Sequence, residues 1–171
     1  MIKGVEVKEV KKLVDERGFF AEVMRTDWHD IFQDPLLQIN LSCSYPGTIR
    51  AWHRHNEGQV DRFIVIEGAA KICAYDDDKK SETCGELDEI ILSDESLKIA
   101  RIPGYLWHGF KALGIRETKL LYGVNRLYDY RSPDEERRPW DDHKLIPQSI
   151  NGRLDDPRAG KPWDWNYPPH K

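Results

Sequence analysis

The chain has 171 residues and a mass of 20.0 kDa, which is enough for one hydrophobic core and too little for two of ordinary size. Its net charge of -4 and pI near 5.9 give no bulk attraction for nucleic acid or for an anionic membrane surface, so an anionic ligand has to be held by a local group of arginines. We therefore expect a single domain over residues 1–171 that binds neither nucleic acid nor membranes.

The first residues and the cysteines indicate the compartment. The N-terminal segment lacks the apolar stretch of a signal peptide, and no stretch reaches a membrane-spanning length. Cys43, Cys73 and Cys84 are odd in number and lack the close pairing of zinc or dithiol motifs. The sequence predicts a cytoplasmic protein with reduced thiols.

Short apolar runs follow one another along the chain between turn residues. They lie at residues 36–43, 63–66, 70–75, 89–92, 97–102 and 119–124. This regular spacing predicts an all-β sandwich or barrel. Helical signals are confined to a turn or two at residues 27–32 and to the segment after Pro133, whose acidic start suits the positive end of a helix dipole.

The segment 60–68, VDRFIVIEG, has the pattern of a central strand. Alternation places Asp61 and Phe63 on one face and Arg62 and Ile64 on the other, and both faces are mostly apolar. A strand of this kind is buried on both sides. Asp61 is then expected to point inward, where it needs a polar partner.

The last forty or so residues, 131–171, are rich in charges, prolines and tryptophans and show no helix or strand period. Left in water, Trp163, Trp165 and Tyr167 would form a costly apolar patch. We expect an irregular tail that packs on the barrel or on a partner subunit.

Three histidines indicate a pocket. His53 and His55 lie two residues apart, so they share one face of a strand, and His108 follows the Pro103-Gly104 turn. A lone histidine usually does no more than hydrogen-bond within its core. A pair joined by a third from another part of the chain favours a shared site.

The segment 47–68, GTIRAWHRHNEGQVDRFIVIEG, nearly matches the first motif of the cupins, which carries His-any-His and then an acidic residue. In metal cupins a histidine from a second motif completes three nitrogen ligands and one oxygen, a set suited to iron, manganese, nickel or zinc. The corresponding residues here are His53, His55, Asp61 and His108. One interpretation is therefore a metal-dependent cupin enzyme with a divalent metal as cofactor.

Five segments in sequence carry a more specific resemblance. They are DERGFFAE (15–22), QINLSCSYPGTIRAWH (38–53), SETCGE (81–86), IPGYLWHGF (102–110) and LLYGVNRLYDYRSPDEERRPWDD (120–142). Together, and in this order, they resemble the dTDP-4-dehydrorhamnose 3,5-epimerase family of the cupin superfamily. The resemblance implies a cupin-type jelly-roll barrel with a few short helices. It also implies a homodimeric isomerase of polysaccharide biosynthesis that needs no cofactor and acts on a dTDP-4-keto-6-deoxyhexose or a similar sugar nucleotide.

The resemblance also implies roles for individual residues. His53 matches the family's base and Tyr128 its acid, while Arg50 and His108 match residues that line the sugar site. The residues that match the family's nucleotide-binding set, partly across a dimer, are Arg17, Phe20, Glu22, Gln38 and Asn40. A base and an acid on opposite faces suit a 4-keto sugar, whose C3 and C5 protons are acidified by the carbonyl group. Arg50 and His53 are three residues apart, so they can face the same pocket only if a bulge interrupts their strand.

The chain departs from the family pattern in three places. Asp61 stands where the family has a lysine that stabilises the enolate, and His55 stands where a glutamine is common. The C-terminal aspartate that orients the base has no evident match, and the candidates are Asp155, Asp156 and Asp164. A third interpretation is therefore a non-catalytic protein that binds a sugar nucleotide.

Overall fold

The structure is a computed structural model that describes residues 1–167. It is an all-β fold, as expected, and no helix occurs within these residues. The strands are β1 (Glu6–Glu9), β2 (Leu13–Asp15), β3 (Gly18–Phe20), β4 (Gln38–Ser44), β5 (Ile49–Arg54), β6 (Val60–Glu67), β7 (Ala69–Tyr75), β8 (Glu86–Ser93), β9 (Lys98–Pro103), β10 (Trp107–Leu113), β11 (Thr118–Val124), β12 (Glu136–Arg137) and β13 (Ser149–Ile150).

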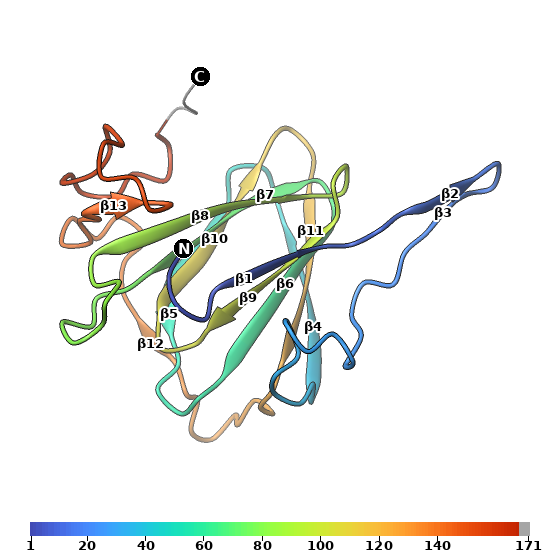
Figure 1. The fold of residues 1–171 in the computed structure, drawn as a ribbon, viewed down its shortest axis with the longest axis horizontal. Coiled ribbons are helices and arrows are strands. Elements are labelled where there is room, and N and C mark those ends of the chain that lie inside the picture. Colours follow the sequence, from blue (N-terminus) through green and yellow to red (C-terminus); the bar gives the residue numbers. More distant parts are fainter. Residues whose placement is uncertain (168–171) are drawn as a thin grey trace.

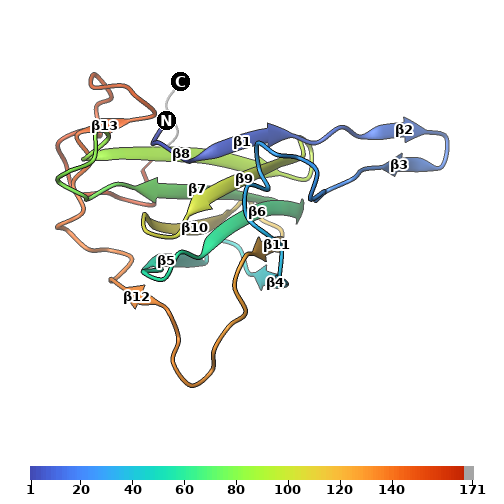
Figure 2. The same cartoon turned by 60° about the horizontal axis from the view of Figure 1, so that its bottom comes forward.

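Two sheets build the barrel. The five-stranded sheet has the order β1-β9-β6-β11-β4, and the six-stranded sheet has the order β12-β5-β10-β7-β8-β13. Figures 1 and 2 show the two sheets lying one against the other, with the chain crossing between them several times. Neighbouring strands are antiparallel, apart from the short parallel pair of β13 with β8.

The core lies between the sheets. Ile72 and Leu92 of the six-stranded sheet belong to one cluster with Val65 and Leu120 of the five-stranded sheet, and all four side chains are fully buried. Burial of a side chain of this size stabilises the fold by about 1.5–3 kcal/mol. The apolar runs of the sequence supply this core.

The predicted runs all form strands, namely β4, β6, β7, β8, β9 and β11. The expectation of a strand buried on both faces at 60–68 is confirmed for Val60 to Val65 of β6, which are all buried, whereas Ile66 is 40% exposed. Asp61 is 2% exposed and points into the barrel. The three cysteines form no disulfide, as predicted.

Both predicted helices are absent. Residues 27–32 make a single turn, in which the amide of Phe32 donates to the carbonyl oxygen of Trp28 at 2.7 Å, and Pro35 follows too closely for a helix to continue. After Pro133 the chain instead forms β12, which pairs with β5. The open edge of β5 offers hydrogen-bond partners to the backbone groups of this segment, so they need not pair within a helix.

The hairpin of β2 and β3 stands away from the barrel, as Figures 1 and 2 both show. Its strands pair from Leu13 with Phe20 to Asp15 with Gly18, and every residue in them is exposed. An isolated two-stranded hairpin is marginally stable in water. This one leaves Phe19 and Phe20 uncovered in the single chain.

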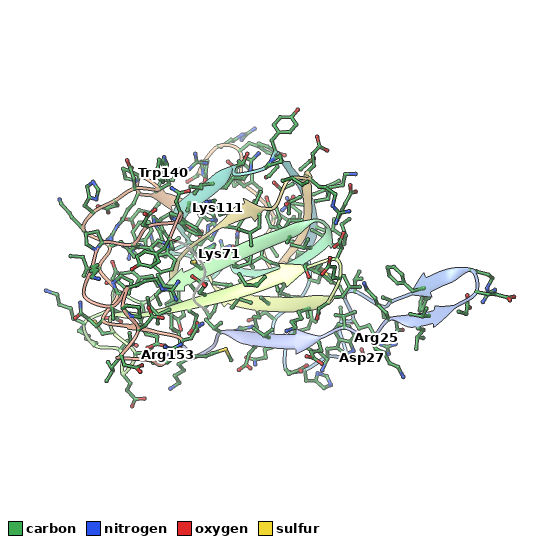
Figure 3. All side chains as sticks on the ribbon, turned by 90° about the horizontal axis from the view of Figure 1, so that it is seen from above. Arg25, Asp27, Lys71, Lys111, Trp140 and Arg153 are labelled. Carbon is green, nitrogen blue, oxygen red and sulfur yellow. The ribbon has the colours of Figure 1, made fainter. Side chains whose placement is uncertain are left out.

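The tail packs on the outer side of the six-stranded sheet. Trp163 and Trp165 are buried, and the ring of Trp165 lies 4.8 Å from that of Trp52 on β5. Lys111, labelled near Lys71 in Figure 3, donates from Nζ to Asn166 Oδ1 at 2.6 Å. The tail therefore covers the back of the strand that carries His53. No helix among the described residues is long and apolar enough to cross a membrane.

Candidate active site

A cleft of about 650 Å³ opens between the two sheets. Its walls come from β4, β6 and β11 of the five-stranded sheet and from β5 and β10 of the six-stranded sheet. The turn between β5 and β6 and the loop between β11 and β12 close its rim. Among the side chains that line it are Gln38, Asn40, Arg50, His53, His55, Asp61, Tyr122, Tyr128, Asp134 and Arg137.

A bulge in β5 turns Arg50 and His53 toward the same space. In the pairing with β10, His53 lies opposite His108 and Arg50 opposite Phe110, so three steps along β5 match two along β10. Both side chains line the cleft, and the expected interruption of the strand is present. Gly109 accommodates it, because a Cβ atom there would lie 2.3 Å from the Cβ of Ala51.

Asp61 and His108 form a buried pair at the bottom of the cleft. His108 Nε2 donates to Asp61 Oδ2 at 2.8 Å, and His108 Nδ1 donates to the carbonyl oxygen of Leu106 at 2.8 Å. Both ring nitrogens face acceptors, so both carry a proton when Asp61 is ionised. The prediction that Asp61 needs an inward polar partner is confirmed. The partner is a histidinium, and the pair as a whole is neutral.

The histidines around Asp61 differ in charge. Burial raises the pKa of Asp61, but its hydrogen bonds with His108 and His55 outweigh burial, so the pKa lies below its usual value. Burial and the neighbouring charge of His108, whose ring lies 4.3 Å away, hold the pKa of His53 well below its ordinary value. His53 is therefore a neutral imidazole at pH 7, able to accept a proton.

His55 contacts both the buried carboxylate of Asp61 and the rim of the cleft. Its Nε2 lies 3.5 Å from Asp61 Oδ2, and the amide nitrogen of Gln59 is within 3.0 Å of Nε2 and 2.9 Å of Asp61 Oδ1. On the other side its Nδ1 donates to the backbone carbonyl oxygen of Asp134. Burial lowers the pKa of His55, but its contacts with Asp61 outweigh this effect and leave the pKa above the usual value.

The geometry of these four residues also suits a metal ion. One ligand atom from each of His53, His55, Asp61 and His108 lies within 4.8 Å of the others. Three imidazoles and a carboxylate suit a divalent transition metal, and the bond from His108 Nδ1 to a backbone carbonyl is the outer contact that orients a ligating histidine. The donor set therefore fits a metal.

Two tyrosines line the cleft, and they differ in how firmly they are held. Tyr128 lies in the loop after β11, is 46% exposed, and packs its ring edge-on against Tyr130 at 4.9 Å. Tyr122 belongs to β11 itself and packs against Phe63, with 5.8 Å between the rings. Tyr122 thus faces the cleft from the sheet opposite the one that carries His53.

Arg50 is the one arginine of the cleft, among the residues that the structure describes, without an ion pair. Its Nε donates to Ser44 Oγ at 3.2 Å. The other arginines of the lining are paired: Arg126 with Glu57, Arg137 with Glu135, and Arg138 with Asp77. Arg50 is thus the cation available to a ligand.

The residues predicted for the nucleotide divide into two groups. Gln38 and Asn40 line the cleft from β4, and Gln38 Nε2 donates to Asn40 Oδ1 at 2.7 Å. Arg17, Phe20 and Glu22 lie in or next to the projecting hairpin and line no part of this chain's own cleft. Arg17 pairs with Asp15, and Glu22 pairs with Arg25.

The C-terminal aspartates bond elsewhere. Asp156 holds Arg158 through two bonds near 3 Å, Asp155 lies 3.6 Å from Arg153, and Asp164 accepts from the amide of Asn166. The carboxylate close to His53 is Asp61, from a strand in the middle of the sequence.

Sequence reasoning missed Tyr122, Gln59 and Asp134. Tyr122 lies inside the apolar run 119–124, which predicts a strand but gives no sign of a polar role. Gln59 and Asp134 act through the geometry of two turns, for which the only signal was the polar character of residues 56–59 and 132–136. All three contact the cleft.

Comparison with known proteins gives the family of the chain. The sequence profile of the dTDP-4-dehydrorhamnose 3,5-epimerase family matches residues 1–150. The probable low-salt glycan biosynthesis epimerase Agl13 of Haloferax volcanii is 44% identical over 140 residues, which are 82% of this chain and 89% of that protein.

Solved structures share the fold. A dTDP sugar isomerase from Desulfovibrio desulfuricans superposes with a TM-score of 0.76 at 26% identity, covering 85% of this chain and 90% of that one. An epimerase from Legionella pneumophila in complex with dTDP-4-keto-L-rhamnose gives a TM-score of 0.73 at 28% identity, covering 95% and 83%. The cupin-type barrel expected from the sequence is confirmed, without its short helices. The chain belongs to the dTDP-4-dehydrorhamnose 3,5-epimerase family.

Proposed function

We propose that the protein epimerises a nucleotide-linked 4-keto-6-deoxy sugar, with His53 as the base and a tyrosine across the cleft as the acid. The observation that carries this proposal is the placement of a neutral imidazole on one sheet and a tyrosine on the other, both lining one cleft. A substrate between them would have a proton acceptor on one face and a proton donor on the opposite face. That arrangement is what inversion at a carbon atom requires.

The reaction needs only proton transfers. His53 takes the proton from a carbon next to the ketone, and the electron pair moves onto the carbonyl oxygen to form an enolate. The tyrosine hydroxyl then protonates the same carbon from the other side, and solvent restores both residues. Arg50, which has no ion pair among the described residues, supplies the positive charge opposite the enolate.

Two tyrosines are candidates for the acid. The sequence predicts Tyr128, and the structure adds Tyr122, which is anchored in β11 and contacts Phe63 in the cleft wall. An acid works best when its position is fixed before the reaction, and this favours Tyr122. Tyr128, at the rim, is placed to contact the sugar as it enters.

The nucleotide part of the substrate is proposed from the resemblance and from the lining of the cleft. The Legionella relative is described in complex with dTDP-4-keto-L-rhamnose. In this chain the amides of Gln38 and Asn40 line the cleft from β4 and offer donors and acceptors suited to a nucleotide base. The sugar nucleotide is the ligand class that we assign to the site.

Deuterium exchange tests the proposal directly. The protein is incubated in D2O with dTDP-4-keto-6-deoxy-D-glucose, and deuterium at C3 and C5 is followed by NMR. We expect exchange at one or both carbons with wild-type protein and its loss with His53→Asn. If the wild-type protein bound the sugar nucleotide without exchange, the non-catalytic interpretation would be supported and the epimerase activity would be ruled out.

Paired tyrosine variants identify the acid. Loss of a general acid typically costs about 10²–10⁴-fold in rate. We expect Tyr122→Phe to show a loss in this range and Tyr128→Phe a smaller one. Tyr130→Phe is the matched control, since Tyr130 is 87% exposed and its side chain is outside the cleft lining. A full loss in Tyr128→Phe with an active Tyr122→Phe would reverse the assignment.

A metal-dependent activity is the second candidate, and the compact set of His53, His55, Asp61 and His108 favours it. A bound divalent ion would supply the Lewis acid that a developing enolate needs. His53 cannot then serve as the base, because a nitrogen bound to metal cannot also accept a proton. Elemental analysis of protein purified from metal-supplemented medium distinguishes the two. Stoichiometric metal that is lost in a His55→Ala and Asp61→Ala double variant would favour this candidate, and metal-free active protein would exclude it.

We also propose that the protein is a homodimer. Ile39 and Leu41 on the outer face of β4, an edge strand, form a row of exposed apolar side chains with Leu37, which directly precedes the strand. Such an edge attracts another strand unless it is covered. The projecting hairpin carries the predicted nucleotide residues Arg17 and Phe20 away from this chain's cleft, which fits a role in the cleft of a second copy.

A further inference from the structure

The loop of residues 125–135, here called the Tyr128 loop, joins β11 to β12 and carries Tyr128 over the cleft. In Figure 2 it extends well beyond the barrel. Its middle has one hydrogen bond to the barrel, from the amide of Tyr128 to Gln38 Oε1 at 3.1 Å, while Leu127 is 70% and Tyr130 87% exposed. The other contacts that hold the loop to the barrel lie at its two ends.

Both ends are bound to one turn, residues 55–60, between β5 and β6. At the first end, Asn125 Oδ1 accepts from the amide of Val60 at 2.7 Å, and Arg126 Nη2 lies 2.7 Å from Glu57 Oε2. At the second end, the Asp134 carboxylate accepts from two consecutive backbone amides of the same turn.

The second end of the loop is bound to more deeply buried residues than the first end. The two oxygens of Asp134 accept from the amides of Asn56 and Glu57 at 2.8 and 2.9 Å, and its backbone carbonyl accepts from His55 Nδ1 at 2.5 Å. His55 is 8% exposed, and its Nε2 lies 3.5 Å from Asp61 in the floor of the cleft. A continuous set of contacts thus joins the cleft floor to the loop.

We propose that His55 and Asp134 are positioning residues that hold the Tyr128 loop in register with the cleft floor. The proposal rests on the proposed function, because it assigns Tyr128 a contact with the sugar. A carbonyl oxygen can only accept, so the proton of His55 sits on Nδ1 in this arrangement. The ring then acts as a rigid spacer between the loop and Asp61. Its effect on the reaction passes through Tyr128.

Matched substitutions at His55 test the spacer. The amide nitrogen of an asparagine occupies nearly the position of histidine Nδ1, whereas that of a glutamine reaches the position of Nε2. We expect His55→Ala to lower kcat/KM by about 10-fold or more, as misplaced groups do. His55→Asn restores most of the loss because it keeps the bond to the Asp134 carbonyl group, and His55→Gln does not. Equal losses in all three variants would overturn the proposal.

Asp134→Ala tests the other half, with Asp142→Ala as its control. Asp142 also accepts from a backbone amide, that of Lys144 at 3.0 Å, but it lies outside the cleft lining. We expect the loss of kcat/KM in Asp134→Ala to shrink to less than about 2-fold in a Tyr128→Phe background, since coupled residues are not additive. Additive losses would show that Asp134 does not act through Tyr128.

Limited trypsin digestion tests the same contacts in the absence of substrate. Arg131 lies in the exposed middle of the loop, so the cleavage rate after it reports how well the ends are held. We expect faster cleavage in Asp134→Ala and His55→Ala, and wild-type rates in His55→Asn and Asp142→Ala. Unchanged cleavage in Asp134→Ala would overturn the proposal. If wild-type protein exchanged no sugar protons, the proposed function would be refuted. The trypsin digestion would still decide whether His55 and Asp134 hold the loop.

Discussion

Asp61 changes the electrostatics of the cleft at the scale of a single residue. The resemblance implies a lysine at this position, which would add a free cation next to His108. Asp61 instead forms a neutral pair with His108 and approaches His55. In the reaction that we propose, the positive charge opposite the enolate then comes from another strand, and Arg50 on β5 is the group available.

Loss of the Asp61 carboxylate should be costly for stability. Removing one partner of a buried ion pair costs about 3–5 kcal/mol, since the other charge is left without compensation. We expect Asp61→Ala to lower the free energy of unfolding in urea by this amount. Glu67→Ala, on the same strand, is the control. Glu67 pairs with Lys119 at the surface, and such a pair contributes about 0–1 kcal/mol. Similar losses in the two variants would show that the Asp61–His108 pair is not an ion pair in solution.

At the scale of the strand, the bulge in β5 brings Arg50 and His53 into one cleft, and Gly109 on β10 makes room for it. A Cβ atom at position 109 would also lie 2.6 Å from the carbonyl oxygen of Arg50, so backbone must shift to admit it. We expect Gly109→Ala to cost about 1–3 kcal/mol and to reduce sugar-proton exchange as well. Ala112→Gly, in the same strand, should cost about 0.5–1 kcal/mol and leave exchange intact. Full exchange activity in Gly109→Ala would mean that the bulge does not place the base.

The strands differ in how far their sequences predict them. The residues of β7, β9 and β11 are mostly apolar, so these strands appear as apolar runs in the sequence. β5 and β10 do not, since Arg50 and His53 of β5 line the cleft and His108 of β10 is buried beneath it against Asp61. Polar residues inside a barrel erase the alternation on which prediction depends. The segment after Pro133 had helical signals, but pairing with the edge of β5 outweighed them.

The site was predictable where it depends on residue type and not where it depends on loop geometry. His53, His55, Asp61 and His108 come together as the motif indicated. The contacts of Asp134 with the turn at 55–60 could not be read from the sequence, because they require two segments almost eighty positions apart to meet at a set angle. The candidates for the missing C-terminal aspartate lie in the tail, where they contact Arg153, Arg158 and Asn166.

At the scale of the whole molecule, the uncovered surface of β4 is the feature that a single chain leaves unexplained. Ile39 and Leu41 are 54% and 61% exposed on an edge strand whose other face lines the cleft. A second copy that covers this row would lie beside the cleft, because the other face of β4 lines it. The Leu41→Lys substitution would place a charge in the row that the second copy covers. A charge is costly to bury unless it is paired.

We therefore expect wild-type protein to sediment as a dimer and Leu41→Lys to sediment as a monomer at micromolar concentration. Ile115→Lys is the control, since Ile115 is 95% exposed in the turn between β10 and β11 and away from the apolar row of β4. It should remain dimeric. If Arg17 and Phe20 serve the partner's cleft, the Leu41→Lys monomer should also bind dTDP more weakly, with a normal circular dichroism spectrum. A monomeric wild-type protein, or a dimeric Leu41→Lys variant, would show that the β4 surface is not a dimer interface. The hairpin would then have no partner's cleft to serve.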